Sequence, residues 1–336
     1  MADYHYEVTS LPVDETLFYR RADSIQRLRF LLRYAHLAPS TYNSQPWKFR
    51  IVMNQIWVYA DPERWLKIAD ADKRELYLSI GCAIENLQIA ADHYNFKSQI
   101  KYFPDRLQPD LVAIFEFQGH ESDTQIADAA MMQAISSRRI CRGRYQREPL
   151  QASHWALIES CSSDGVSLVS TRQMPALRDK IAELIPLAYQ VLYSDRAYLE
   201  ERKLSFKYRQ ANMHGIRAAL RKWMPIGVSG RQGPKLGRKD HELIKNAPGL
   251  IMLGSQQDTP EMQVKAGRVF QRIALIATTL RIGVQVHSQI LELPELRSEL
   301  RDFIRKQIHP TMLIRIGYCQ RKHRATPRRP LADVLI

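Results

Sequence analysis

The sequence lacks a long hydrophobic run: no window of its 336 residues approaches the eighteen or so consecutive apolar residues of a membrane span. Its first stretch, MADYHYEVTSLPVDE, has neither the basic region nor the apolar region of a secretory leader. With 45% hydrophobic and 25% charged residues, the composition is typical of a folded globular protein. We therefore expect a cytoplasmic protein with no membrane partner.

Signatures of metal sites and disulfide frameworks are also missing. The four cysteines form no Cys-x-x-Cys pair, and the ten histidines form no His-x-x-x-His or His-Glu-x-x-His pattern. These absences argue against a zinc site and against a small disulfide-rich fold. We expect no metal, and free thiols at Cys82, Cys141, Cys161 and Cys319.

Acidic residues are missing from one segment. The net charge is +14, and residues 202–239 contain eleven Lys or Arg and no Asp or Glu. A basic run is typical of a solvated insertion, but it also permits a nucleic-acid-binding module. Only three aromatic residues accompany the run, whereas surfaces that follow nucleic acid usually interleave many. Nucleic acid is therefore an unlikely partner by this reasoning, and we keep it as the third alternative.

What the sequence does have is an alternation of helical and strand patterns. Apolar spacing and turn residues predict helices over 24–37, 76–94 and 152–161, and long helices over 175–224. Alternating or compact apolar runs predict strands over 47–53, 55–60, 111–117 and 166–170. The 76–94 helix is too apolar for a surface position, so we expect it to be central.

An internal repeat is the most informative feature. Placing Gly81 over Gly267 aligns GCAIENLQIAADHYNFKSQI with GRVFQRIALIATTLRIGVQV without a gap, and a strand after Pro109 corresponds to one after Pro310. Upstream, FYRRADSIQ around Arg20 and Arg21 corresponds to ISSRRICRG around Arg138 and Arg139. Three elements repeated in the same order favour a duplication, here one that resembles a fused homodimer. We expect halves at 1–125 and 126–336, a boundary near 119–128, and an insertion at about 176–245 in the second half.

Several motifs carry a family resemblance. LAPSTYNSQPWKF resembles the Ala-Pro-Ser-x-x-Asn-x-Gln-Pro-Trp turn of the nitroreductase superfamily, and the segments that open with Gly81 and Gly267 resemble its central helix. SRRICRGRY is similar to the arginine-rich opening of that family, and TPRRPLADVL to the C-terminal arginine motif of its tandem, Acg-like branch. The resemblance implies the α+β fold of FMN-dependent nitroreductases, with flavin at the interface between the copies.

The resemblance also implies which residues bind FMN. It places Pro39, Ser40, Thr41 and Asn43 against the flavin ring, with Gln45 bracing the turn, and presents the flavin N5 with the backbone N–H groups of Ser288 and Gln289. Planar guanidinium groups suit the phosphate end, because they pair with phosphate bidentately and stay charged. The candidates there are Arg138, Arg139, Arg142, Arg328 and Arg329.

Plainer explanations remain open at each position. Asn43 can form an Asx turn in an ordinary loop, and the arginines can form a solvated basic turn. Ile140 stands where the family has a serine, which removes one hydroxyl contact to phosphate, and Cys141 replaces it only weakly. His287 is expected to be a packed histidine without a catalytic role.

The implied activity is hydride transfer from NADPH or NADH through FMN N5 to a nitroaromatic, quinone or other conjugated acceptor. The flavin supplies the chemistry, so no protein acid or base is needed for the hydride step. The sequence has no Gly-x-Gly-x-x-Gly motif, which agrees with a nicotinamide bound in the flavin pocket. The second alternative is a flavin-binding or flavin-sequestering protein whose insertion covers the site. We expect one FMN per chain and consider a monomer plausible, because only the first copy has the turn and only the second has the arginine motifs.

Overall fold

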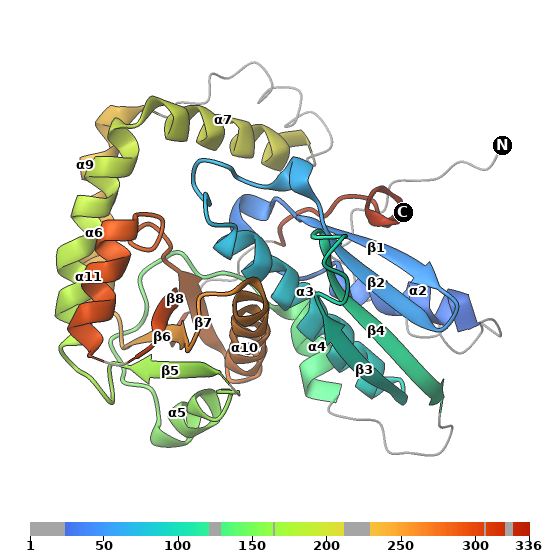
Figure 1. Cartoon of the computed structure of the whole chain (residues 1–336). Coiled ribbons are helices and arrows are strands. Elements are labelled where there is room, and N and C mark those ends of the chain that lie inside the picture. The colour runs from blue at the N-terminus through green and yellow to red at the C-terminus, as the bar shows by residue number, and fades with distance from the viewer. Residues whose placement is uncertain (1–23, 121–128, 164, 212–228, 306, 320–324) are drawn as a thin grey trace.

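Two antiparallel sheets with helices between and outside them make up an α+β fold, as the sequence predicts (Figure 1). The computed structural model describes residues 24–120, 129–163, 165–211, 229–305, 307–319 and 325–336. The predicted counterpart of the arginine motif at Arg20 and Arg21, and most of the predicted boundary at 119–128, lie outside these residues.

The first sheet has the strand order β1-β2-β4-β3. Its strands are β1 (Trp47–Val52), β2 (Gln55–Ala60), β3 (Phe96–Tyr102) and β4 (Leu111–His120). Every second residue of β2 is buried, which is the pattern of a strand with one face on the core. The helical elements of this part are α2 (Ser24–Ala35), η1 (Thr41–Asn43), η2 (Pro62–Arg64) and α3 (Arg74–His93).

The second sheet repeats this topology in the order β5-β6-β8-β7. Its strands are β5 (Val166–Ser170), β6 (Gly249–Ser255), β7 (Ile282–Val286) and β8 (His309–Tyr318). The helices α4 (Ala129–Ser137) and α5 (Ala152–Glu159) precede it, α10 (Pro260–Thr279) joins β6 to β7, and α11 (Pro294–Ile304) joins β7 to β8. Because each strand takes the place of the strand four earlier, the topology is consistent with two fused copies.

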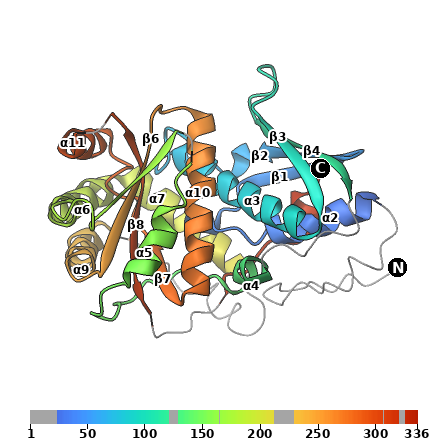
Figure 2. The ribbon, with the colours of Figure 1, turned by 90° about the horizontal axis from the view of Figure 1, so that it is seen from below.

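The two central helices, α3 and α10, pack against each other between the sheets (Figure 2). Gly81 lies against the Val264 carbonyl and Gly267 against the Leu78 carbonyl, and a Cβ at either glycine would collide with that backbone. The contact is reciprocal, as in the isologous interface of a two-fold dimer. The residues that the repeat aligns thus meet at the helix crossing.

The insertion of the second part lies between β5 and β6. It contains α6 (Leu177–Ser194), α7 (Arg196–Ala211), η3 (Gly230–Gln232) and α9 (Gly233–Lys245), whereas β1 and β2 are joined by a two-residue turn. α6, α9 and α11 cover the outer face of the second sheet and enclose a second apolar core there (Figure 2). Residues 212–228 of the predicted basic segment lie outside the described part of the chain.

The C-terminal tail returns to the first sheet. After η4 (Leu331–Val334), Leu335 pairs in parallel with Phe49 of β1, and the Ile336 N–H donates to the Phe49 carbonyl over 2.9 Å. The last residues of the second half therefore complete the edge of the first sheet. The division into 1–125 and 126–336 stays a prediction, and it does not separate the two halves as packed bodies.

The expectation of four free thiols is wrong for two of them. Cys141 and Cys319 form a disulfide across a sequence separation of 178 residues, whereas Cys82 and Cys161 are free and buried. No local spacing in the sequence signals this pair. Cys141 comes close to Cys319, at the end of β8, only because residues 140–141 pair with β7 in the folded chain. Spacing rules detect disulfides of small cysteine-rich domains, not a single bond across a large fold.

Candidate functional site

The turn that opens the candidate site is held in an unusual backbone conformation. Tyr42, Asn43 and Gln45 all have left-handed φ values, of 52°, 62° and 52°. The Ser40 hydroxyl accepts a hydrogen bond from the Gln45 backbone N–H over 2.9 Å and so closes the turn on itself. Non-glycine residues in this region carry strain that the surrounding structure must offset, and such strain is concentrated at functional sites.

Arg328, from the C-terminal tail, fixes this turn. All five of its N–H groups donate hydrogen bonds of 2.8–3.2 Å. The acceptors are the carbonyls of His36, Leu37, Ala38 and Thr326 and the side-chain oxygen of Asn43. Burial, with smaller contributions from the neighbouring Arg138 and Arg139, lowers the pKa of Arg328 to about 9. The phosphate role predicted for Arg328 does not fit this arrangement, because no N–H is left to bind an anion; the residue instead positions the turn.

Arg329 and His36 complete the junction between tail and turn. The Arg329 side chain is directed to the buried Asp61 and to the Asp333 carbonyl, away from the other arginines. His36 accepts from the Trp47 indole N–H at Nδ1 and donates from Nε2 to the Arg329 carbonyl. Burial lowers the pKa of His36 to about 3, so the ring is neutral and its tautomer follows from its two partners.

At the other side of the turn, Arg138 is a buried cation with unused donors. Its Nε and Nη1 atoms have no hydrogen-bond acceptor among the described residues. Burial lowers the pKa of Arg138 to about 10, and Arg139 adds to the effect. Arg139 itself is bound to the carbonyls of Ser136 and Arg138. A buried guanidinium group with unpaired donors is a place for an anion, because leaving such donors unpaired is costly.

Arg142 differs from these neighbours. Its side chain is exposed, and within the described part of the chain no hydrogen bond or ion pair joins it to the cluster. Of the five predicted arginines, the structure therefore brings together Arg138, Arg139 and Arg328, of which only Arg138 has free buried donors.

The opposite end of the site gathers polar groups from three segments. The Thr41 hydroxyl donates to Glu75 at the start of α3 over 2.5 Å, and the Ser79 hydroxyl accepts from the Thr41 N–H. In the loop after β7, the backbone N–H groups of Ser288 and Gln289 make no hydrogen bond to any described residue, and the buried Gln289 Oε1 has no donor. Unpaired N–H groups here agree with the predicted main-chain role, which nonetheless stays a prediction.

Glu292 is a residue that the sequence did not single out. It accepts from the Ser288 hydroxyl over 2.9 Å and from the Tyr198 hydroxyl over 3.1 Å. Burial raises the pKa of Glu292 to about 8, and the nearby Glu75 carboxylate raises it further. Glu75 of the first copy and Glu292 of the second copy thus lie at the same end of the site. No local motif predicts that these two residues come close together.

Helix α7 of the insertion closes over the turn (Figure 1). Arg202 donates to the Tyr42 hydroxyl over 2.6 Å, and its guanidinium lies 5.0–5.8 Å from the rings of Tyr42, Tyr193 and Tyr198. Such contacts combine hydrogen bonding with cation–π attraction. Glu201 additionally accepts from backbone N–H groups in the loop before α3. Side chains of the insertion therefore touch the first copy at the site.

Two general findings bear on the predicted partners. Within the described ranges, every helix is too short or too polar to cross a bilayer. The same residues contain no group of three or more His, Cys, Asp or Glu arranged to hold a metal ion.

The fold and site define an α+β protein whose two similar parts jointly build one polar site between them. No protein-family model matches the chain. At 27% identity over 325 residues, it is similar to a Mycobacterium tuberculosis protein named "Putative NAD(P)H nitroreductase Rv3131", with 92% of this chain and 91% of that protein covered. A second relative from this organism, "Putative NAD(P)H nitroreductase acg", is 22% identical over 318 residues, covering 91% and 94%. Over most of its length the chain is thus similar to relatives that carry the nitroreductase name, the Acg protein among them, in agreement with the resemblance of its motifs.

Solved nitroreductases overlap a smaller share of the chain. A "putative nitroreductase in complex with fmn" from Desulfovibrio desulfuricans has 17% identity and a TM-score of 0.39, covering 62% of this chain and 97% of its own. A nitroreductase "with bound FMN" from Desulfitobacterium hafniense has 16% identity and a TM-score of 0.40, covering 61% and 96%.

Proposed function

We propose that this protein is an FMN-binding oxidoreductase that uses NADPH or NADH to reduce a small conjugated acceptor, such as a nitroaromatic or a quinone. The observation that carries the proposal is the pair of unpartnered donors on the buried Arg138, set beside Arg139 and Arg328 next to the Pro39-to-Asn43 turn. The names of its mycobacterial relatives and the FMN in related solved proteins support the same activity.

The polar groups fit FMN at both ends. Arg138, assisted by Arg139, offers charge-assisted bonds to a phosphate. The N–H groups of Ser288 and Gln289, which are unpaired among the described residues, suit the nitrogen edge of the ring. The Thr41 hydroxyl is bound to Glu75, and both polar groups of the Asn43 side chain are bound to the tail, so these side chains would act by holding the turn in shape. Bound FMN would supply two-electron hydride chemistry, which no side chain can provide.

The chain's own residues orient and enclose the reactants. Arg328 and Gln45 hold the turn against the tail, so the ring-facing atoms are fixed before binding. Arg202 binds the Tyr42 hydroxyl of the turn from α7 and restricts solvent access to it. The buried Glu292 is a proton-holding carboxyl at neutral pH because its pKa is raised, so it adds no negative charge beside the proposed ring position.

The decisive experiment is an absorbance spectrum of the full-length protein purified without added flavin, followed by FMN titration of the apoprotein. We expect flavin absorbance bands, bleaching by NADPH or NADH without oxygen, and their return when a quinone is added. A colourless protein that takes up no FMN would overturn the proposal.

The arginines can be tested one at a time. Arg138→Ala should lose FMN on a desalting column yet bind riboflavin as the wild type does, because riboflavin has no phosphate. Arg142→Ala is the matched control, since Arg142 is exposed and outside the cluster. Equal loss of FMN and riboflavin in Arg138→Ala would mean that this arginine does not act on the phosphate.

A second candidate function is flavin storage without turnover, which the contact between Arg202 and Tyr42 favours. If α7 keeps the ring covered, bound FMN should stay oxidised in the presence of NADPH or NADH. Arg202→Ala should then speed flavin reduction, with Lys203→Ala as control because the ion pair of Lys203 within the described residues is to Glu200 of the same helix. Fast reduction in the wild type would exclude this alternative.

A further inference from the structure

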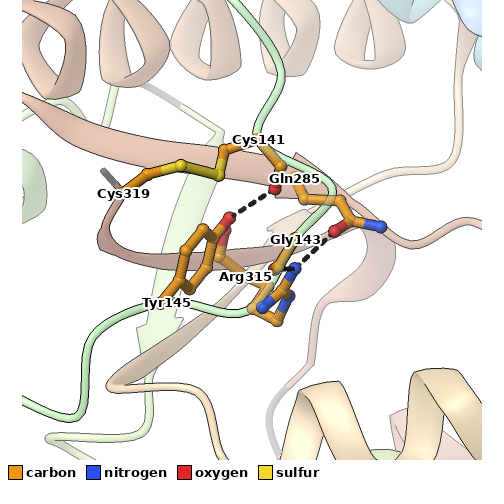
Figure 3. The surroundings of a disulfide bond; sticks show 6 residues. All are labelled: Cys141, Gly143, Tyr145, Gln285, Arg315 and Cys319. Atoms are coloured by element: carbon orange, nitrogen blue, oxygen red, sulfur yellow. Dashed lines mark hydrogen bonds between the residues drawn. A yellow bond between two sulfur atoms is a disulfide. The ribbon is translucent and has the colours of Figure 1, made fainter. Parts of the chain in front are cut away.

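The Cys141–Cys319 disulfide joins the segment after α4 to the end of β8 (Figure 3). Cys141 follows the arginines at 138–139 by two residues, and Cys319 directly follows β8. From Cys319 the chain leads to the tail whose Arg328 holds the turn. One covalent bond therefore ties the proposed phosphate segment to the end of β8.

The segment after Arg139 is further docked on the second sheet. The Cys141 N–H donates to the Val284 carbonyl over 3.0 Å. The Tyr145 hydroxyl lies 3.2 Å from the Cys141 carbonyl, and Arg315 stacks 4.0 Å from the Tyr145 ring while donating to the Gly143 carbonyl (Figure 3). These contacts hold residues 141–145, and backbone pairing with Val284 of β7 holds the chain between Arg139 and Cys141.

The sheet also makes room for the disulfide. Gly283 of β7 faces it, and a Cβ there would lie 2.7 Å from the Cys319 Cβ and 2.9 Å from the Cys141 Cβ. Any larger residue at this position would push the two cysteines off the sheet. The disulfide thus occupies the space left by the missing side chain of Gly283 in β7, the strand that leads into the Ser288 loop.

We propose that this disulfide is a redox-controlled latch on cofactor retention, an inference that rests on the proposed binding of FMN. When it is intact, the arginine segment is fixed to the end of β8, and Arg138 is pre-organised for a phosphate. When it is reduced, the segment gains freedom, and binding must fix it again at a cost in affinity. Binding of the phosphate becomes weaker, whereas binding of the flavin ring does not change.

The reductant is a dithiol, either a reagent or a redox protein with a paired-cysteine site. One thiolate attacks the Cys319 sulfur, which is more accessible than that of the buried Cys141, and Cys141 leaves as a thiolate. The second thiol of the dithiol resolves the mixed disulfide and releases Cys319. Two electrons and two protons pass to the protein, which gains two thiols, while the dithiol becomes a disulfide.

The test combines thiol counting with two flavin titrations of the full-length apoprotein. Without reductant, a thiol reagent in denaturant should detect two of the four cysteines, and after dithiothreitol all four. The dissociation constant for FMN should then rise about tenfold, the equivalent of one lost charge-assisted bond. The dissociation constant for riboflavin should not change.

Variants separate the latch from general loosening of the fold. Cys319→Ser should bind FMN as the reduced wild type does, with or without dithiothreitol. Cys161→Ser is the matched control, because it removes a free buried thiol and leaves the disulfide intact. If Cys319→Ser does not fold, the reduced wild type alone decides the question.

Each outcome has a distinct meaning. Four reactive thiols before reduction, or an FMN affinity that full reduction leaves unchanged, would overturn the latch and leave the proposed function standing. Equal weakening of FMN and riboflavin would also overturn it, because the bond would then stabilise the whole site. Failure of both flavins to bind in either redox state would overturn the proposed function itself, and the latch with it.

Discussion

Replacing Arg328 tests whether this residue positions the turn or binds an anion. Arg328→Ala removes five donors and leaves four buried carbonyls and the Asn43 oxygen without partners. Each unsatisfied buried acceptor costs about 1–3 kcal/mol, but the losses are not additive, and removing a buried cation recovers part of the desolvation cost. We expect a net loss of about 3–5 kcal/mol in the free energy of unfolding of the apoprotein.

The measurement is chemical denaturation of flavin-free protein, with the slope of the transition compared between variants. Arg142→Ala is the control and should stay within about 0.5 kcal/mol of the wild type, because its side chain is exposed. Arg138→Ala should be neutral or stabilising in the apoprotein, since it removes buried donors without partners. If Arg328→Ala instead unfolds within about 1 kcal/mol of the wild type, with an unchanged slope, the positioning role is refuted.

Three further predictions use the pKa shifts and the asymmetry of the site. Burial lowers the pKa of His36 to about 3 in the folded protein, so the unfolded state takes up the proton first as the pH falls through about 6.5. His36 should therefore contribute fully to the free energy of unfolding above pH 6.5, and about 2 kcal/mol of that free energy should be lost by pH 5. His36→Gln should lack this pH dependence in a series of denaturation curves. For Glu292, the folded pKa of about 8 lies above the unfolded value, so stability present below about pH 4.5 is lost as the pH rises through 8. Glu292→Gln should become progressively more stable than the wild type over that window, and parallel curves would contradict the shift. Fluorescence titration should saturate at one FMN per chain at every protein concentration, whereas two per chain, or binding only above a dimerisation threshold, would contradict a single site.

The fold was largely predictable because its signals are periodic or repeated. The apolar pattern that aligns Gly81 with Gly267 predicts a central helix in each copy. The structure places both glycines where α3 crosses α10. Strand β5 matches the predicted 166–170 run, since it is compact, apolar and bounded by turn residues.

Contacts between segments distant in sequence were not predictable. Nothing near Cys141 signals Cys319, and nothing near Arg202 signals Tyr42, because each pair forms only after the two parts pack together. Arg328 shows a second limit: its motif marks the tail, but whether its donors bind a phosphate or backbone carbonyls depends on where the turn lies. The roles of the predicted flavin contacts remain predictions.

The asymmetry of the two parts explains why one site is expected where a symmetric dimer has two. At the end of β7, no described residue accepts a hydrogen bond from the Ser288 and Gln289 N–H groups. At the end of β3, the corresponding edge of the first sheet, the Tyr102 hydroxyl instead accepts from Arg268, and Phe103 packs edge-on against Tyr77 at 5.6 Å. Aromatic packing therefore fills this edge of the first sheet, which agrees with a single site in a fused chain that no longer needs both copies.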